Sequence, residues 1–405
     1  MRLSGANLDH TRRYNRRVVL EIARLRGPLS RADVTRATGL APQTISNITE
    51  ELCAAGLLRA VPRRPGKRGE PTVVFEINPE GGYTFGISLE DNRLVVLLAD
   101  LAGALVHREE MHIEPAPPET VLKLVERTVK RMLARFGIAR SRVWGVGLVI
   151  PGLVQDGELV VLGPSSLTSW AGYPLARELQ SRLAMPAYIE NDATAAAIGE
   201  WLYGAGKSLT DFVYLHFGVG VGAGLFVRGQ PYRGGFGKSG EIGHMIVEAD
   251  GRPCACGNRG CLERYVSLSA AQSALTGKPE GEGTVDPPRL SEAFMSGEPS
   301  IVAWVHEAAR RLSQAVVGLE NLLDPQTIIV GGMVPRPILE AIIARMSPLS
   351  RSVSADRAHP IDRVVLARMD LDSPALGAAT LPIFDCITPE LSLVLQQEAA
   401  NGAAR

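Results

Sequence analysis

The first 80 residues show an apolar pattern typical of helices followed by extended chain. Apolar residues recur at near-helical spacing within residues 15–26, and Gly27 with Pro28 ends that segment. Capping residues and spacing predict two further helices, over residues 31–38 and 42–55, and alternation predicts a strand over residues 72–77. Three helices followed by a hairpin predict a winged helix-turn-helix, which we expect over residues 1–80.

Beyond a boundary at residues 78–82 the pattern changes to alternating strands and helices. The expected strands cover residues 84–89, 93–100, 105–111, 143–149, 212–216, 223–227 and 327–330, and the expected helices cover residues 119–136 and 301–323. This order predicts an α/β body with two halves, residues 81–191 and 192–405. A ligand site is expected in the cleft between them.

The formal net charge is zero, but the charge is unevenly distributed. Residues 1–70 contain 14 Lys+Arg and 6 Asp+Glu, a balance of +8, so the rest of the chain carries −8. A basic head on an acidic body is expected when the head alone contacts nucleic acid, although a solvated basic face would give the same balance. No apolar run approaches bilayer length and no signal-peptide pattern is present, so we expect a cytoplasmic protein without a membrane partner.

The helix over residues 42–55 has the pattern of a recognition helix. Its residues Ile45, Ile48 and Leu52 share one face, which would pack inward. The polar side chains near its start point away from that face, where they would meet base edges or phosphates: Gln43, Thr44, Ser46 and Asn47. The proline-glycine loop that follows would contact DNA as a basic wing: Arg63, Arg64, Lys67 and Arg68. The alternative is the polar face of an ordinary bundle, but helix and wing together favour double-stranded DNA as a partner.

A compact group of cysteines lies in the second half. Cys254, Cys256 and Cys261 fall close together, and His244 precedes them. In a cytosolic protein such a cluster indicates a metal site before a disulfide, and three thiolates with one imidazole satisfy tetrahedral Zn²⁺. Four protein ligands leave no open position for a reactive water. We therefore predict a structural zinc ion rather than a catalytic one.

The segment Glu-x-Gly-His at residues 241–244, followed by Cys-x-Cys-Gly-x-x-Gly-Cys-x-Glu at residues 254–263, resembles the signature of the ROK family of repressors and sugar kinases. Residues 189–193, 218–224 and 324–332 resemble further segments of that family, and the helix-turn-helix resembles its repressor branch. The resemblance implies an actin-like, hexokinase-like ATPase fold, with two α/β halves and a sugar between them. An α+β winged helix-turn-helix domain would precede this fold.

By position in these motifs, the resemblance implies a sugar site formed by Asn191, Asp192, Glu241, His244 and Glu263. Carboxylates are strong, directional acceptors for hydroxyl groups, which agrees with this assignment, although each alone could be a solvated surface group. His244 would bind zinc through one ring nitrogen and a sugar hydroxyl through the other. The zinc loop would thereby fix both His244 and Glu263.

On the phosphoryl-donor side the sequence departs from the kinases of the family. Ser88 stands where an Asp is expected, Glu90 and Asp91 stand where glycines are expected, and Val219 replaces a hydroxyl residue. Carboxylates facing a polyphosphate repel it by about 1 kcal/mol or more per close pair. Asp192 keeps the position of a general base, but without a donor site it would be a vestige, so we predict no catalytic residues and no enzyme activity.

The main hypothesis is therefore a transcriptional regulator, a repressor of carbohydrate metabolism whose operator affinity is modulated by a sugar or sugar derivative. A palindromic operator requires paired recognition helices, so we expect a homodimer or homotetramer. One alternative is an active ATP-dependent sugar kinase with a DNA-binding head, which the substitutions at Ser88 and Glu90 disfavour. The other is a regulator controlled by a protein partner. Ser166 favours this alternative because it occupies an expected sugar-contacting Asn position.

Overall fold

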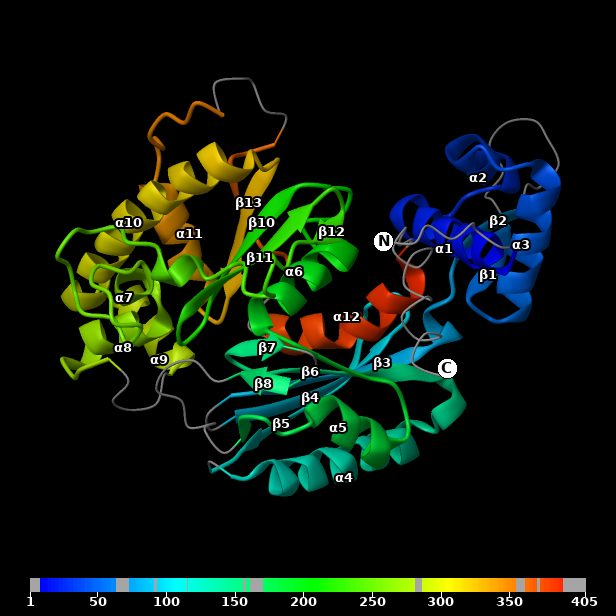
Figure 1. Cartoon of the computed structure of the whole chain (residues 1–405), viewed down its shortest axis with the longest axis horizontal. Helices are drawn as coiled ribbons and strands as arrows, with labels where there is room; N and C mark the ends of the chain where they lie inside the picture. The colour runs from blue at the N-terminus through cyan, green and yellow to red at the C-terminus, as the bar shows by residue number, and fades with distance from the viewer. Residues whose placement is uncertain are drawn as a thin grey trace, which may run out of the picture.

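The computed structural model describes residues 8–62, 73–90, 93–114, 116–155, 158–160, 170–280, 286–354, 361–369 and 372–388. These residues form an N-terminal head and an α/β body that contains two large sheets (Figure 1). Within these ranges, no helix is both long enough and apolar enough to cross a membrane.

The head contains three helices and one hairpin. Its elements are α1 (Leu8–Arg26), α2 (Arg31–Thr38), α3 (Pro42–Ala54), β1 (Leu58–Pro62) and β2 (Val73–Ile77), with the two strands antiparallel. Ser30 begins α2 in a capping box with Asp33, and Gly39 ends it in the left-handed region at φ 70°. The three apolar residues of α3 that the sequence directs inward are buried: Ile45, Ile48 and Leu52.

Two five-stranded sheets with the same topology form the body. The strand orders are β5-β4-β3-β6-β9 and β12-β11-β10-β13-β14. In each sheet an antiparallel three-stranded meander is followed by two parallel strands. The first sheet contains β3 (Tyr83–Leu89), β4 (Arg93–Asp100), β5 (Leu105–His112), β6 (Val143–Val149) and β9 (Ala187–Glu190). The second contains β10 (Phe212–Phe217), β11 (Val221–Val227), β12 (Gln230–Pro231), β13 (Thr327–Gly332) and β14 (Val364–Leu366).

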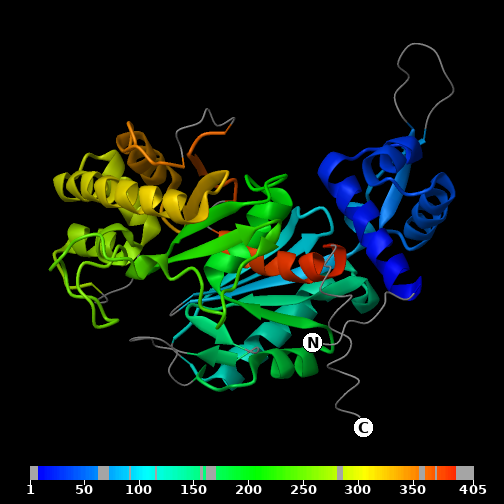
Figure 2. The same cartoon turned by 45° about the horizontal axis from the view of Figure 1, so that its top comes forward.

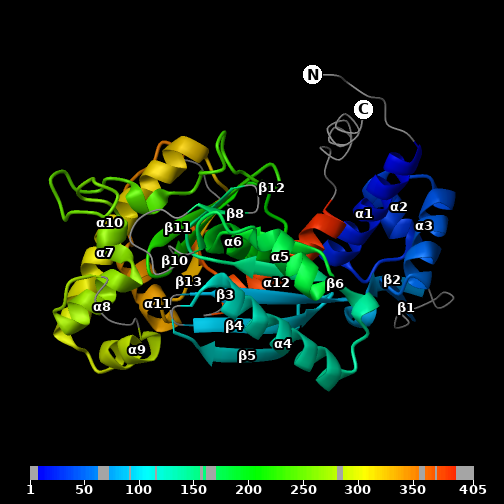
Figure 3. The same cartoon turned by 60° about the horizontal axis from the view of Figure 1, so that its bottom comes forward.

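Two helices, α6 (Asp192–Tyr203) and α12 (Ser373–Ile387), pack against each other between the sheets (Figures 1 and 3). Helix α12 lies on β3 and β6 of the first sheet, and α6 lies on β10 and β11 of the second. Small residues allow this close approach, because a Cβ added at Gly147 would lie 1.9 Å from the carbonyl oxygen of Ala378. The chain thus returns from the second half to cover the first sheet.

The remaining helices cover the outer faces of the two sheets. Helices α4 (Pro118–Phe136) and α5 (Leu175–Leu183) pack on the first sheet, and a small hairpin of β7 (Leu153–Gln155) and β8 (Glu158–Val160) contacts α5 (Figure 1). The second sheet is covered by α7 (Glu263–Val266), α8 (Leu268–Thr276), α9 (Pro287–Met295), α10 (Pro299–Leu323) and α11 (Arg336–Arg345). Each outer layer contributes its own apolar core cluster.

The head packs on the body through α1, which contacts the end of α12 (Figure 2). One apolar cluster runs from Leu20 and Ala23 of α1 to Trp201 of α6 and Phe384 of α12. A polar contact accompanies it, since the Arg24 guanidinium donates to the carbonyl oxygen of Leu202 and lies 4.9 Å from the centre of the Trp201 ring. The end of α6 is therefore part of the surface of the body that contacts the head.

Candidate functional site

The start of α6 positions two of the predicted sugar-binding residues. Asn191 caps the helix, because its Oδ1 accepts the backbone N–H of Thr194 at 2.7 Å. The Oδ1 of Asp192 accepts the backbone N–H of Ala193, also at 2.7 Å. The other carboxylate oxygen, Oδ2, lies 3.7 Å from Nε2 of His216 on β10. These contacts hold both side chains at the point where β9 leads into α6.

Three more predicted residues meet around a 3₁₀ turn, Ile242–His244. Nε2 of His244 lies 3.9 Å from Oε2 of Glu241, and Nδ1 lies 3.4 Å from Oε1 of Glu263. Burial raises the pKa of Glu241, the nearby His244 opposes that rise, and the carboxylates of Asp192 and Glu263 add to it. The structure therefore brings the predicted residues from both segments into electrostatic contact.

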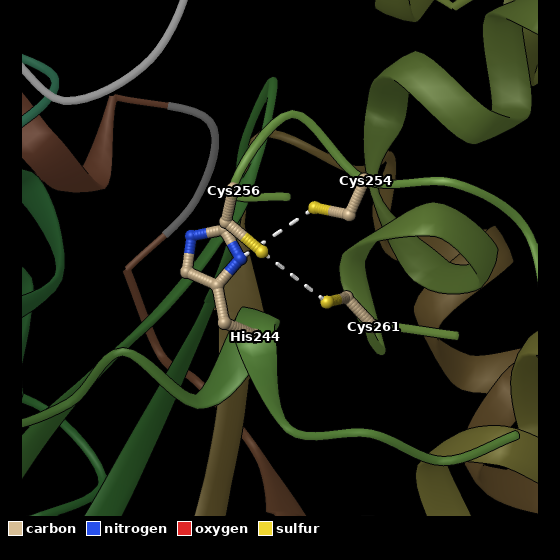
Figure 4. Close-up of side chains that lie close together, drawn as sticks. All are labelled: His244, Cys254, Cys256 and Cys261. Carbon is tan, nitrogen blue, oxygen red and sulfur yellow. Dashed lines mark hydrogen bonds between the residues drawn. The ribbon is translucent and has the colours of Figure 1, made fainter. Parts of the chain in front are cut away.

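Next to this group, His244, Cys254, Cys256 and Cys261 turn their ligand atoms toward one another (Figure 4). All four atoms lie within 4.8 Å of one another, with 3.7 Å between Cys254 Sγ and His244 Nδ1 and 3.6 Å between Cys256 Sγ and Cys261 Sγ. A tetrahedral ion with 2.3 Å bonds to sulfur requires sulfur atoms about 3.8 Å apart. The cluster fits a tetrahedral metal ion.

The two nitrogens of His244 face different partners. Nδ1 faces the thiols, whereas Nε2 faces Glu241. Glu263 also borders the cluster, because the Cys254 thiol donates to its Oε1 at 2.9 Å. Burial and this carboxylate raise the pKa of Cys254, whereas the backbone N–H of Asn258 lowers the pKa of Cys256. The His/Cys cluster and the carboxylate group thus form one continuous polar site.

The segment that corresponds to the first phosphate loop of a kinase carries a half-buried ion pair. Glu90 Oε1 lies 3.2 Å from Nη1 of Arg93 and 3.5 Å from Oγ of Ser88. Burial raises the pKa of Glu90, Arg93 lowers it, and Asp192 raises it again, so Glu90 lies within electrostatic range of Asp192. Val219, on the loop between β10 and β11, is 47% exposed and offers no hydroxyl group. Asp91 lies outside the described residues.

A cavity of about 770 Å³ lies elsewhere, beside α12 and the start of α11. Its lining includes Gly331, Gly332, Arg336, Arg368 and Tyr203, and it includes none of the predicted sugar-binding residues. Because a sugar needs hydroxyl acceptors rather than a mainly apolar wall, the polar site around Asp192 and His244 remains the better match for such a ligand.

In the head, the polar face of α3 has the exposure that a DNA-reading helix needs. Gln43 and Asn47 are exposed and joined by a side-chain hydrogen bond of 3.0 Å, whereas Thr44 and Ser46 are half-buried. Four predicted wing residues lie outside the described residues: Arg63, Arg64, Lys67 and Arg68. Ser166 also lies outside them.

Two polar residues that the sequence alone does not single out lie at functional contacts in the structure. His216 lies beside Asp192, and Arg24 lies where the head contacts the body. A histidine within an apolar strand and an arginine within an amphipathic helix carry no signal of their partners, which are distant in sequence.

Comparison with known proteins defines the class of this architecture. An actin-like, hexokinase-like body with a winged helix-turn-helix head is the fold predicted from sequence, and its structural relatives confirm it. The sequence profile described as "ROK family" matches residues 84–383. The chain belongs to the ROK family, which confirms the resemblance.

Both regulators and kinases are found among its relatives. The chain is 26% identical over 378 residues to "Xylose repressor" of Bacillus spizizenii, covering 93% of this chain and 97% of that protein. A solved "ROK family transcriptional regulator, homolog of E.coli MLC protein" superposes with a TM-score of 0.73 at 25% identity, covering 96% of this chain and all of that one. A ROK family glucokinase from Streptomyces griseus, solved with glucose and AMPPNP, gives a TM-score of 0.60 at 28% identity. It covers 74% of this chain and 99% of that one.

Proposed function

We propose that this chain is a ligand-responsive transcriptional repressor that binds operator DNA through its head and does not phosphorylate its ligand. The ligand is a sugar or sugar derivative held around Asp192, Glu241 and His244. A structural zinc ion in the His/Cys cluster orders that site. The protein acts in the cytoplasm, where its DNA target lies, as a homodimer or homotetramer on a palindromic operator.

The observation that carries this proposal is the presence of the head together with the similarity to repressors over nearly the whole chain. The solved glucokinase covers only 74% of this chain, whereas the solved regulator covers 96%. A head whose reading helix exposes Gln43 and Asn47 adds a surface that a sugar kinase does not need.

The charges around Glu90 support the absence of phosphoryl transfer. That reaction needs positive charge and backbone amides around the transferred phosphate. Here a carboxylate occupies the corresponding segment, and its partner Arg93 is bound by Glu90, Glu110 and Asp372 at 2.9–3.2 Å. Binding of hydroxyl groups needs only well-placed acceptors, so the ligand site does not depend on the donor site.

Replacing Gln43 and Asn47 by Ala is expected to relax the DNA sequence preference of the full-length protein. Each lost bidentate base contact removes about 1–3 kcal/mol of discrimination against the wrong base. Selection from a random DNA pool, followed by competition assays, measures the change. Gln180→Ala, on the exposed face of α5, is the matched control. An unchanged sequence preference in the double variant would contradict the assignment of α3 as the reading helix.

Calorimetry against a panel of sugars that includes D-xylose and D-glucose is expected to show binding that Asp192→Ala or Glu263→Ala weakens. A hydrogen bond to a charged group contributes about 1.5–3 kcal/mol, so each loss corresponds to roughly a 10- to 150-fold lower affinity. The exposed Asp362→Ala variant is the control. In the same samples, ATP consumption is expected to stay at background.

The possible outcomes separate the three functions. Robust ATP turnover with a bound sugar would contradict the regulator without kinase activity and favour a sugar kinase with a DNA-binding head. Specific DNA binding without affinity for any sugar of the panel would instead favour control by a protein partner.

A further inference from the structure

His216 is a polar residue that is buried in an apolar part of the fold. It lies near the end of β10, where its neighbours in the strand are apolar, and only 2% of it is exposed. Within the described parts of the chain, neither ring nitrogen has a hydrogen-bond partner. A buried donor or acceptor without a partner lowers stability, so an apolar residue at this position would suit the strand better.

The surroundings of the ring offer one strong acceptor. Nε2 points toward Oδ2 of Asp192 at 3.7 Å, and the loop glycine Gly218 is so close that an added Cβ would lie 3.2 Å from the same nitrogen. The Tyr214 ring lies farther off, with 6.2 Å between ring centres. Burial lowers the pKa of His216, although Asp192 opposes this shift, so a neutral ring with one N–H is favoured.

The two oxygens of Asp192 have different neighbours among the described residues. Its Oδ1 accepts the backbone N–H of Ala193, and its Oδ2 is the oxygen that faces His216. A small rotation of either side chain would shorten the separation from 3.7 Å to a hydrogen bond. With both oxygens engaged, the plane of the carboxylate would be fixed, and its remaining lone pairs would point in constant directions.

We infer that His216 is a positioning residue of the ligand site: its Nε2–H holds the Asp192 carboxylate in the orientation that accepts ligand hydroxyl groups. The inference rests on the proposed ligand site at Asp192, and it adds the residue that orients that site. His216 acts through Asp192 and does not touch the ligand.

A space-filling role and a positioning role both allow an apolar replacement to keep stability, but they predict different ligand affinities for it. Leu has similar bulk and no polar atoms, so His216→Leu is expected to keep or raise the melting temperature while it lowers ligand affinity. Gln can still donate a hydrogen bond, so His216→Gln is expected to recover most of the affinity that Leu loses. If His216 only filled space, Leu would preserve both stability and affinity.

The contact itself is tested without any ligand by ¹⁵N NMR of the histidine rings in the full-length protein. We expect His216, assigned from the His216→Gln spectrum, to be neutral with its proton on Nε2. Asp192→Asn is expected to shift its ring signals, whereas Asp362→Asn is expected to leave them unchanged. Ring signals that do not respond to Asp192→Asn would overturn the inference.

Calorimetry with D-xylose and D-glucose supplies the second measurement. His216→Leu is expected to weaken binding by at least about tenfold, and His216→Gln by no more than about threefold. Equal affinity in the Leu variant and the natural protein would overturn the inference even if the NMR contact is present. If neither sugar binds the natural protein, the proposed sugar response fails, while the NMR measurement still decides whether His216 holds Asp192.

Discussion

Purified protein is expected to contain one zinc ion per chain, and Cys256→Ser is expected to lose both the ion and much of the stability of the loop around it. His244, Cys254 and Cys261 would remain, but three ligands bind zinc far more weakly than four. The segment between His244 and Glu263 contains no named helix or strand, and turn and bridge contacts hold its backbone, such as Val247 N–H to the carbonyl oxygen of Gly260. Loss of a bound metal is among the few changes that cost more than about 4 kcal/mol.

Elemental analysis and thermal unfolding check this expectation, with Cys386→Ser as the control. Cys386 is an exposed cysteine on α12, away from the cluster, so its replacement should change neither metal content nor melting temperature. Ligand affinity should also fall in Cys256→Ser, because a bound ion would fix the ring orientation of His244 and thereby the nitrogen that faces Glu241. If the natural protein contained no metal, and if Cys256→Ser had the same melting temperature as the natural protein, the zinc assignment would be wrong.

The sequence predicts those parts of the fold whose ends are marked by caps or by the limits of an apolar run. Helix α2 has the predicted bounds because caps mark its ends, and strands β4 and β6 have them as largely buried apolar runs. The winged head and the two α/β halves could therefore be predicted from pattern alone. The matching topology of the two sheets could not, since it depends on which strands pair rather than on where strands occur.

The two inner helices show why some elements escape prediction. Helix α12 contains Pro374, Gly377 and Pro382, residues that argue against a helix, and it is buried on nearly all sides, so it has no polar face to give a helical period. Helix α6 is rich in alanine and almost wholly buried for the same reason. Both form because tertiary packing between two sheets outweighs their local preferences.

The candidate site likewise contains residues that can be predicted from sequence and residues that cannot. The proximity of the His/Cys cluster could be predicted because ligand type and spacing are encoded within one short segment. The partners of Asp192 could not, because His216 comes from a different strand and Glu90 from the other half of the body. Sequence motifs thus indicate the proposed ligand site, whereas the charges that surround it come together only when the two halves are folded.

Arg24→Ala is expected to destabilise the full-length protein by about 3–5 kcal/mol and to loosen the head from the body. Arg24 and Glu21 form a two-point ion pair at 2.6 and 2.8 Å, with side chains only 4% and 11% exposed. Removing the guanidinium leaves the Glu21 carboxylate buried without its partner, and it also removes the contact with the Leu202 carbonyl oxygen at the end of α6. Thermal unfolding and the fluorescence of Trp201, whose ring contacts Arg24, measure the two effects.

Two further variants identify which interaction of Arg24 accounts for the expected loss of stability. Arg26→Ala, on the exposed side of the same helix, should change the melting temperature little. The double variant Glu21→Leu with Arg24→Met replaces the buried pair by apolar side chains, so it should recover most of the stability that Arg24→Ala loses. Because α6 begins at Asp192 and ends at this contact, the double variant should still bind ligand at α6 while its DNA affinity responds less to that ligand. A full ligand response in the double variant would mean that the signal reaches the head through α12 instead, which also contacts α1.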